Sequence, residues 1–236
     1  MTHRQQLMLA TGILIALLAL YAVILVVNAR MEAVASATTI PYAGLTRRVT
    51  NDGAPILGAP EAATTIVVFL DYACPHCALY QNTLNAFIEQ AIRPGQARLE
   101  IRLLAGLDPT GSPVAARAAL CAGAQNAFWE MHAELLEMQN IRSADIFTSD
   151  RIRTAAERLG LNSEELLRCI SNPNSFRDAL QSNVDLANSL GVKTLPAVLY
   201  RRGSGYPAWF ERNNQRLTGG VPLDVLSSVI QVTPAP

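Results

Sequence analysis

The sequence predicts an α/β domain in which a strand–helix–strand unit is separated from two later strands and a last helix by a helical insertion. Two observations lead to this prediction. An apolar run at residues 66–70 precedes two cysteines with two residues between them, and helical patterns then dominate residues 108–190. A third observation, a nearly unbroken apolar segment at residues 7–27, predicts one transmembrane helix ahead of the domain.

The N-terminal segment is predicted to anchor the chain in a membrane. No charged residue occurs from Gln5 to Ala29, and an apolar run of this length can cross a bilayer. A cleaved signal peptide is the competing interpretation, because residues 35–37 read Ala-Ser-Ala. A signal peptide, however, has a shorter apolar region of about 7 to 15 residues, which lies closer to its cleavage site. We therefore predict an uncleaved anchor at residues 1–29.

Small and polar residues with frequent Gly and Pro follow the anchor. This composition predicts an extracytoplasmic linker at residues 30–60, with one short strand near residues 46–50. The remainder, residues 61–236, is long enough for a single hydrophobic core. A formal net charge of +0 argues against a nucleic-acid-binding surface.

Local signals predict the elements of the domain. The apolar run predicts a buried strand at residues 65–70, a helix extends from Cys74 to Ile92, and a second strand covers residues 97–104. Proline is common at the first position of a helix and asparagine at its N-cap, so Pro113 and Asn162 each predict the start of a helix. The helices predicted in the insertion cover residues 113–124, 128–138, 149–159, 166–170 and 173–190. The last predicted elements are strands at residues 197–200 and 216–217 and a helix at residues 222–229.

The motif Cys74-Pro75-His76-Cys77 is the predicted site of chemistry. A helix that begins at Cys74 places this thiol near unpaired backbone N–H groups and the positive end of the helix dipole, which favour the thiolate and lower the thiol pKa. Pro75 has no N–H to leave unsatisfied, and His76 can bring a positive charge or a hydrogen-bond donor to the Cys74 sulfur. Cys77, about one turn further on, is then the resolving thiol.

Half of a structural zinc site is the alternative interpretation of this cysteine spacing. Such a site needs two more ligands, and the remaining candidates, Cys121, Cys169, His3 and His132, do not have the spacing of a zinc finger. We therefore predict no metal and no organic cofactor.

The other two cysteines, Cys121 and Cys169, fall on two helices of the insertion. In an oxidising compartment they form either one structural disulfide, which we favour, or two buried thiols. A bond across this separation would stabilise the fold by about 4 kcal/mol in the chain-entropy model. His132, close to Phe128 and Trp129, is predicted to pack in the core rather than to act in catalysis.

These motifs together resemble the DsbA-type branch of the thioredoxin-fold family. The resemblance covers residues 55–232 and rests on the Cys-Pro-His-Cys motif after a buried strand, the helical insertion, and the segment Gly191-Val192-Lys193-Thr194-Leu195-Pro196 before another strand. Residues 55–62 and 69–74, and Cys121-Ala122-Gly123 followed by residues 128–132, are similar to segments of bacterial members. The fold implied is a thioredoxin fold with an inserted helical subdomain.

The resemblance also implies roles for individual residues. Pro196 is expected to follow a cis peptide bond and to pack against the active-site disulfide, with Thr194 and Leu195 next to a bound substrate strand. Two positions depart from the family pattern. Val68 replaces a buried acid that in many relatives moves protons to the resolving thiol, and Leu195 stands where Thr or Val is usual.

The resulting hypothesis is a membrane-anchored, single-pass thiol–disulfide oxidoreductase that faces the periplasm or an equivalent space and donates disulfides to folding proteins through Cys74 and Cys77. The expected partners are protein thiols and a quinone-linked membrane protein of the DsbB or vitamin K epoxide reductase type, and the chain is expected to be a monomer. The alternatives are a reductase or isomerase that uses the same dithiol, and a non-enzymatic accessory subunit of a membrane complex.

Overall fold

The computed structural model describes residues 17–22, 42–139 and 145–230, and the chain divides into two compact units, residues 1–43 and 44–236. Within the first unit, residues 17–22 are helical. Among the described residues, no helix is both long and apolar enough to span a membrane. Most of the predicted anchor, residues 1–29, lies outside the described residues.

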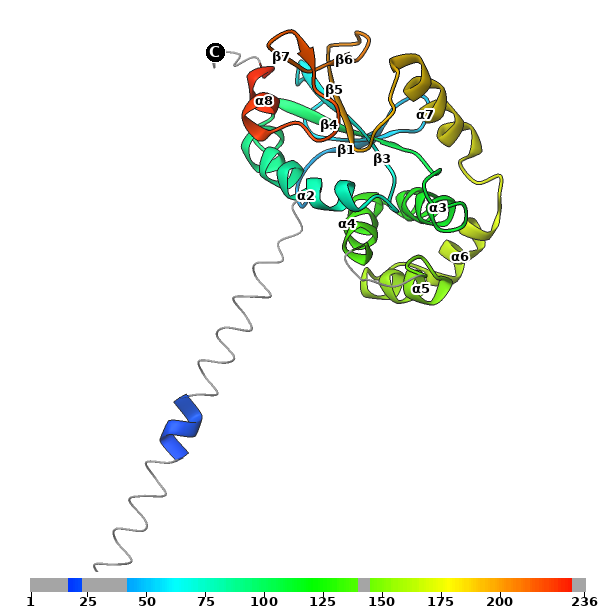
Figure 1. The fold of residues 1–236 in the computed structure, drawn as a ribbon. Helices are drawn as coiled ribbons and strands as arrows, with labels where there is room; N and C mark the ends of the chain where they lie inside the picture. Colours follow the sequence, from blue (N-terminus) through cyan, green and yellow to red (C-terminus); the bar gives the residue numbers. More distant parts are fainter. Residues whose placement is uncertain (1–16, 23–41, 140–144, 231–236) are drawn as a thin grey trace, which may run out of the picture. The chain divides into compact units, whose positions relative to one another are not determined.

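The second unit is built on a six-stranded sheet with the strand order β1-β2-β4-β3-β5-β6 (Figure 1). At its centre, β3 (Thr64–Leu70) and β4 (Ala97–Leu103) run parallel. β5 (Ala197–Arg202) lies antiparallel on the other side of β3 and pairs in turn with β6 (Ala208–Trp209). Every residue of β3 is buried, which explains why residues 66–70 of this strand are all apolar rather than alternating.

The folded unit begins earlier in the chain than predicted. β1 (Arg47–Val49) matches the short strand expected near residues 46–50, but it pairs with β2 (Pro55–Leu57), and β2 pairs with β4. The predicted linker at residues 30–60 therefore contains two strands of the sheet. Gly58 makes this possible: its φ is +114°, and a Cβ atom there would lie 2.8 Å from the Ala97 carbonyl oxygen.

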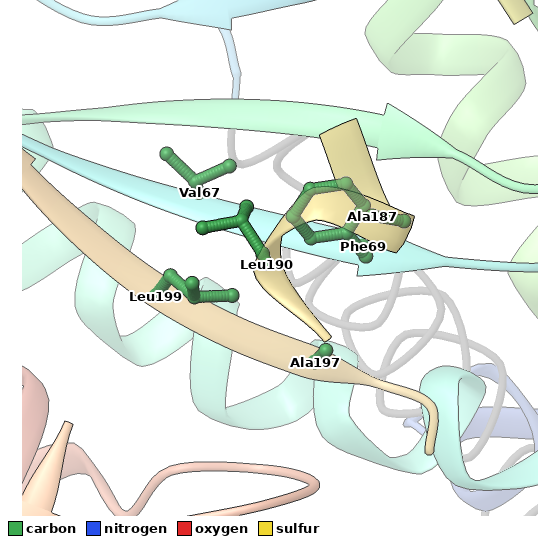
Figure 2. Packing of buried hydrophobic residues seen from close by; sticks show 6 residues of the cluster. All are labelled: Val67, Phe69, Ala187, Leu190, Ala197 and Leu199. Carbon is green, nitrogen blue, oxygen red and sulfur yellow. The ribbon is translucent and has the colours of Figure 1, made fainter. Parts of the chain in front are cut away.

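Helices cover both faces of the sheet. α2 (Pro75–Phe87) continues into a π-helical segment, η1 (Ile88–Ile92), and packs beside α8 (Leu223–Ser228). α7 (Arg177–Leu190) covers the other face, where its residues Ala187 and Leu190 pack against the side chains of β3 and β5 (Figure 2). The sheet side chains in this cluster are Val67, Phe69, Ala197 and Leu199.

Helices α3 to α7 form the insertion between β4 and β5. The first four of them are α3 (Gly111–Ala124), α4 (Phe128–Met138), α5 (Ser149–Arg158) and α6 (Ser163–Ser171). The Asn162 side chain caps α6 by accepting from the Glu165 N–H, as its residue type predicts. α7, predicted from residue 173, begins at Arg177 because Phe176 has a left-handed backbone conformation with φ of +57°. Between β6 and α8, the strands β7 (Glu211–Arg212) and β8 (Gln215–Arg216) form a separate two-stranded sheet.

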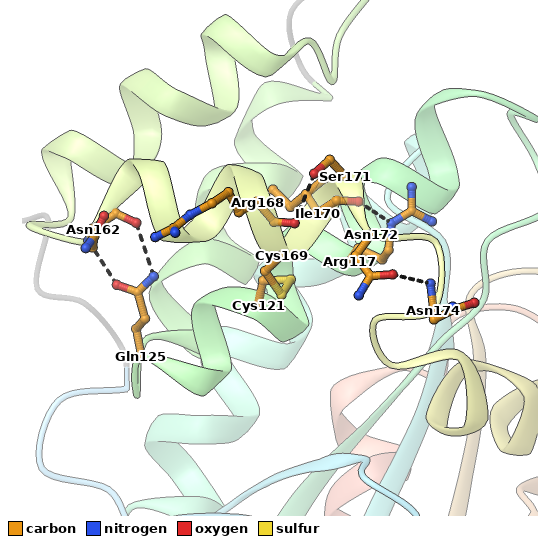
Figure 3. The surroundings of a disulfide bond; sticks show 10 residues. All are labelled: Arg117, Cys121, Gln125, Asn162, Arg168, Cys169, Ile170, Ser171, Asn172 and Asn174. Atoms are coloured by element: carbon orange, nitrogen blue, oxygen red, sulfur yellow. Dashed lines mark hydrogen bonds between the residues drawn. A yellow bond between two sulfur atoms is a disulfide. The ribbon is translucent and has the colours of Figure 1, made fainter.

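Cys121 of α3 and Cys169 of α6 are joined by a disulfide, with Cα atoms 6.0 Å apart (Figure 3). Hydrogen bonds link the same two regions on both sides of the bond. The Gln125 side chain donates to the Asn162 carbonyl and accepts from the Asn162 N–H. The Arg117 guanidinium donates to the Ile170 carbonyl at 2.8 Å.

Candidate active site

The Cys-Pro-His-Cys motif forms the start of α2. Cys74 is the N-cap residue, with extended φ and ψ, and Pro75 occupies the first helical position, where its missing N–H costs nothing. The Cys74 carbonyl accepts from the Cys77 N–H at 3.0 Å and from the Ala78 N–H at 3.3 Å. The Cys74 thiol is therefore held at the positive end of the α2 dipole.

Both cysteines of the motif are free thiols, and both are buried, with 4% of Cys74 and 3% of Cys77 exposed. Burial raises the pKa of the Cys77 thiol far above its usual range, and a hydrogen bond with Cys74 raises it further. Cys77 is consequently protonated in the reduced protein at neutral pH. Pro75 and His76 are exposed beside them.

The loop before β5 meets the motif from the other end of the chain. The Leu195–Pro196 peptide bond is cis, as the family resemblance implied. The Cys74 Sγ donates to the Leu195 carbonyl oxygen at 3.6 Å, a contact between residues 121 positions apart. Leu195 is half-buried and Thr194 is exposed, so the backbone next to the Cys74 sulfur borders on solvent.

A buried carboxylate beneath the motif was not predicted as part of the site. Asp71 is completely buried at the end of β3. One of its oxygens accepts from the Ala73 N–H at 2.9 Å and the Ser112 hydroxyl at 2.7 Å, and the other accepts from the N–H groups of Gly106 and Leu107 at 2.9 and 3.0 Å. Asp71 thus joins the motif to the loop after β4 and to the start of α3. A lone acid directly after an apolar strand was the available signal, since a buried charge requires partners.

Asp71 also acts on the Cys77 thiol. Burial and Cys74 raise the Cys77 pKa most, a backbone hydrogen bond of Asp71 lowers it, and the negative charge of the Asp71 carboxylate raises it. Val68, where many relatives are expected to carry the acid, is fully buried and apolar. The carboxylate that influences Cys77 therefore lies three positions further along the chain.

His132 lies between α4 and the active-site helix. Its Nε2 lies 3.3 Å from the Gln81 side-chain oxygen on α2, and its Nδ1 lies 2.9 Å from the Tyr72 hydroxyl. Because that Gln81 oxygen can only accept, His132 donates through Nε2 and accepts from Tyr72. Its ring stacks on Phe128 with centroids 5.7 Å apart, and complete burial lowers its pKa to about 3. This environment fits the predicted packing role, with the imidazole neutral.

The zinc alternative finds no support in the arrangement of the ligands. Cys121 and Cys169 are bonded to each other, and His132 is enclosed between α2 and α4. Within residues 42–139 and 145–230, no cluster of three or more His, Cys, Asp or Glu side chains could hold a metal ion.

Comparison with known proteins places this geometry in a family. A family model described as "Thioredoxin" matches residues 50–201, more than half of the chain, and the chain belongs to this family. The fold is shared with solved structures. A thioredoxin-like oxidoreductase from Silicibacter pomeroyi DSS-3 is 24% identical, with a TM-score of 0.59 over 76% of this chain and 90% of that one. BdbD from Bacillus subtilis, in its oxidised form, is 19% identical, with a TM-score of 0.63 over 77% and 92%.

Two curated relatives extend the comparison. Disulfide bond formation protein D of Bacillus subtilis (strain 168) is 24% identical over 149 residues, which are 62% of this chain and 67% of that protein. Na(+)/H(+) antiporter NhaA 1 of Salinispora arenicola is 29% identical over 179 residues, which are 74% of this chain but only 24% of the antiporter. The family match and these relatives confirm the predicted resemblance to DsbA-like thiol–disulfide oxidoreductases.

Proposed function

We propose that this chain is an oxidase that donates its Cys74–Cys77 disulfide to reduced, folding proteins. The observation that carries this proposal is the asymmetry of the dithiol. Cys74 is the N-cap of α2 and faces the Leu195 carbonyl, whereas Cys77 lies one turn inside the helix with a raised pKa. This asymmetry supports the proposal that Cys74 meets the substrate and that Cys77 resolves the intermediate.

The reaction proceeds in two exchanges. A substrate thiolate attacks the Cys74 sulfur of the oxidised enzyme, a new sulfur–sulfur bond forms, and Cys77 leaves with the electron pair and takes up a proton. A second substrate thiolate then attacks the substrate sulfur of the mixed disulfide and releases Cys74. The substrate loses two electrons, which reside in the Cys74–Cys77 dithiol until an acceptor removes them.

The proposed substrate face surrounds the Cys74 sulfur and consists of His76, Leu79, Leu107, Thr194 and Leu195. Leu79 and Leu107 are 65% and 56% exposed, so both present apolar side chains to solvent. Asp71 holds Leu107 at this face through its backbone N–H. An unfolded chain fits such a surface because it offers both apolar side chains and an extended backbone. His76 would add a positive charge or a donor close to Cys74.

We further propose that the domain faces an extracytoplasmic space from the anchor at residues 1–29, and that a quinone-linked membrane protein reoxidises it. The charge-free segment from residue 5 to residue 29 supports the anchor, and the Cys121–Cys169 disulfide supports an oxidising compartment. Alkaline extraction of membranes tests the anchor, and external protease digestion tests on which side of the membrane the domain lies. Release of a soluble protein that begins near residue 38 would show cleavage instead.

The activity is tested with the oxidised full chain and a reduced, unfolded protein that carries two cysteines. Cys74→Ser should abolish disulfide transfer. Cys77→Ser, with Cys74 first converted to a mixed disulfide with thionitrobenzoate, should exchange that group for a single-cysteine variant of the substrate and accumulate as the enzyme–substrate mixed disulfide, with release of the thionitrobenzoate. The matched control is the Cys121→Ser/Cys169→Ser double variant, assayed at a temperature at which it is folded, which should retain transfer. Transfer by Cys74→Ser at the wild-type rate would refute the proposal, and a reduction potential close to that of thioredoxin would favour the reductase alternative.

A second candidate is an accessory domain of a membrane transporter, which keeps the fold for binding. The observation in its favour is the match to the Salinispora antiporter, of which this chain spans about a quarter. Two strains test this candidate, one that carries Cys74→Ser and one that lacks the protein. Normal cell growth and cation transport in the first strain only would favour the accessory domain over the oxidase.

A further inference from the structure

At the end of the sheet opposite the dithiol, three buried polar atoms lie in one row without a partner. Thr65 of β3 pairs in register with Arg98 of β4 and with Arg201 of β5. Residues opposite one another on adjacent strands project from the same face of a sheet. The Thr65 hydroxyl and the Nε atoms of Arg98 and Arg201 are all buried, and none of them has a hydrogen-bond partner among the described residues.

The row borders an open cavity of about 560 Å³. We call this cavity the arginine pocket; its lining residues include Arg98, Arg102 and Arg201, with the turns at residues 50–52 and 203–204. It lies on the same face of the sheet as Val67 and Phe69, which α7 covers closer to the active site. Small-molecule sites have volumes in this range, about 300 to 1,000 Å³.

The acidic groups of the pocket are already paired. Glu100, which is fully buried, accepts from Arg102 at 2.6 Å and also from Arg201. Asp52 accepts from the Arg102 Nη1 at 2.5 Å. Arg98 forms no ion pair with any residue in the described part of the chain, and its Nη1 donates to the Pro60 carbonyl at 3.2 Å.

Arg98 is therefore a cation in an unfavourable place. Burial lowers its pKa most, the nearby charges of Arg201 and Arg48 lower it further, and the smaller effects of Glu100 and Glu61 oppose them. Four arginines, at positions 48, 98, 102 and 201, and three acids, at positions 52, 61 and 100, line the pocket or act on Arg98, which leaves one positive charge in excess. A structure that gathers like charges around a cavity and leaves their donors unpaired is complementary to an anion.

We propose that the arginine pocket binds a small organic molecule through an oxyanion, either a phosphate or a carboxylate, held by the guanidinium groups of Arg98 and Arg201. A planar guanidinium can hold two oxygens of such a group at once. For this, Arg98 turns its Nε toward the cavity, since no carboxylate among the described residues forms an ion pair that would hold its guanidinium in place. The rest of the ligand fills the volume that a single oxyanion leaves open.

The test uses the full chain in neutral detergent, with inorganic phosphate and citrate as probes and chloride at matched ionic strength as reference. Titration calorimetry should show saturable binding of at least one probe, and the preferred probe identifies the anionic group. In NMR spectra, the Nε–H signals of Arg98 and Arg201 should shift to saturation. The Nε–H of Arg93, which pairs with Glu89 on the surface, should move only as it does with chloride.

Two variants locate the site. Arg98→Gln should weaken binding about tenfold, which corresponds to about 1.4 kcal/mol for the loss of a charge-assisted pair of hydrogen bonds. Arg202→Gln is the matched control, because it removes the same charge from the next residue of β5, which is exposed and projects from the other face. It should bind within about twofold of the wild-type affinity.

Protein stability gives a second readout that does not depend on the affinity of the variant. Without anions, Arg98→Gln should melt no lower than the wild type, because it removes a cation that Arg201 and Arg48 repel. With saturating probe, the wild type should melt higher, because binding to the native state stabilises it. Non-saturable shifts in the wild type, or equal affinity of Arg98→Gln and wild type, would overturn the proposal, whatever the outcome of the redox assays.

Discussion

The Cys74–Cys77 pair and the Cys121–Cys169 pair lie in the same folded unit, but a disulfide has a different effect on the protein in each pair. Cys121 and Cys169 are 48 positions apart and connect α3 to α6, whereas Cys74 and Cys77 lie within the first turn of α2. A bond across a long loop removes much of the entropy of the unfolded chain, and a bond across one turn removes little. Stability is therefore expected from the Cys121–Cys169 pair, and chemistry from the Cys74–Cys77 pair.

The surroundings of the two pairs differ in the same sense. Around Cys121–Cys169, the bonds of Gln125 with Asn162 and of Arg117 with Ile170 connect helices that the disulfide already joins (Figure 3). Around Cys74, the hydrogen bonds of Asp71 hold the loops next to the motif. The sulfurs of Cys74 and Cys77 are free of covalent partners. One site uses polar contacts to reinforce a cross-link, and the other uses them to position a reactive group.

The largest expected effect separates the pairs by stability. The Cys121→Ser/Cys169→Ser variant should lose about 4 kcal/mol of unfolding free energy in the chain-entropy model. The Cys74→Ser/Cys77→Ser variant, compared with the reduced wild type, should lose much less. Urea unfolding of the three proteins measures the difference. Equal losses, or free alkylation of Cys121 and Cys169 in the native oxidised protein, would contradict this division of roles.

The second effect concerns the carboxylate beneath the reactive pair. In Asp71→Asn an amide nitrogen replaces one oxygen and must face N–H donors, so the variant should lose about 2 to 3 kcal/mol of stability. Removal of the negative charge should also lower the Cys77 pKa, because Asp71 contributes to its elevation. Urea unfolding and the pH dependence of Cys77 alkylation in a Cys74→Ser background measure the two changes.

Asp145→Asn is the control for this substitution, because Asp145 is exposed. It should change neither quantity. If Asp71→Asn unfolded like the wild type, the four hydrogen bonds of Asp71 would not be what holds the loops around the dithiol together.

The third effect is a pH dependence that originates in His132. The pKa of His132 is about 3 in the folded protein and about 6.5 in the unfolded chain, so below pH 6.5 the unfolded state binds a proton that the folded state does not. Stability should therefore decrease as the pH falls from 6.5 toward 3, with a loss of about 2 kcal/mol by pH 5. His132→Asn should be less stable at pH 7 but should show a smaller loss between pH 6.5 and 5.

His76→Asn serves as the control for this measurement, because His76 is exposed. Its unfolding free energy should follow the wild-type pH dependence. An identical slope for His132→Asn and wild type would mean that the imidazole is not kept neutral by its burial between α2 and α4.

The range of the interactions explains which features the sequence predicted and which it missed. The start of α2 at Cys74 and Pro75 and the cap at Asn162 are local, and their residue types were sufficient. The role of Asp71 depends on Gly106 and Ser112, 35 and 41 positions away, and no local pattern specifies such contacts. β1 was predicted as a short strand within the linker, but β2 was missed, because a strand of three residues leaves almost no periodicity.

The smallest expected effect concerns the attachment of β1 to the insertion. Arg47 of β1 donates from two nitrogens to the Glu130 carboxylate of α4, and the two side chains are 32% and 16% exposed. Because exposed ion pairs contribute little and are screened by salt, Glu130→Gln should cost about 0.5 to 1 kcal/mol, and less at high ionic strength. Urea unfolding at low and high salt measures this cost.

Glu134→Gln is the matched control, because Glu134 lies one turn further along α4 and pairs with Arg158 of α5. Both variants should lose similar stability, but only Glu130→Gln should speed hydrogen exchange at the Gly58 N–H, which donates to the Thr46 carbonyl beside β1. Local opening at β1 exposes that N–H, whereas loosening α5 does not. Equal exchange at Gly58 in the two variants would mean that pairing with β2, rather than the ion pair, holds β1 in the sheet.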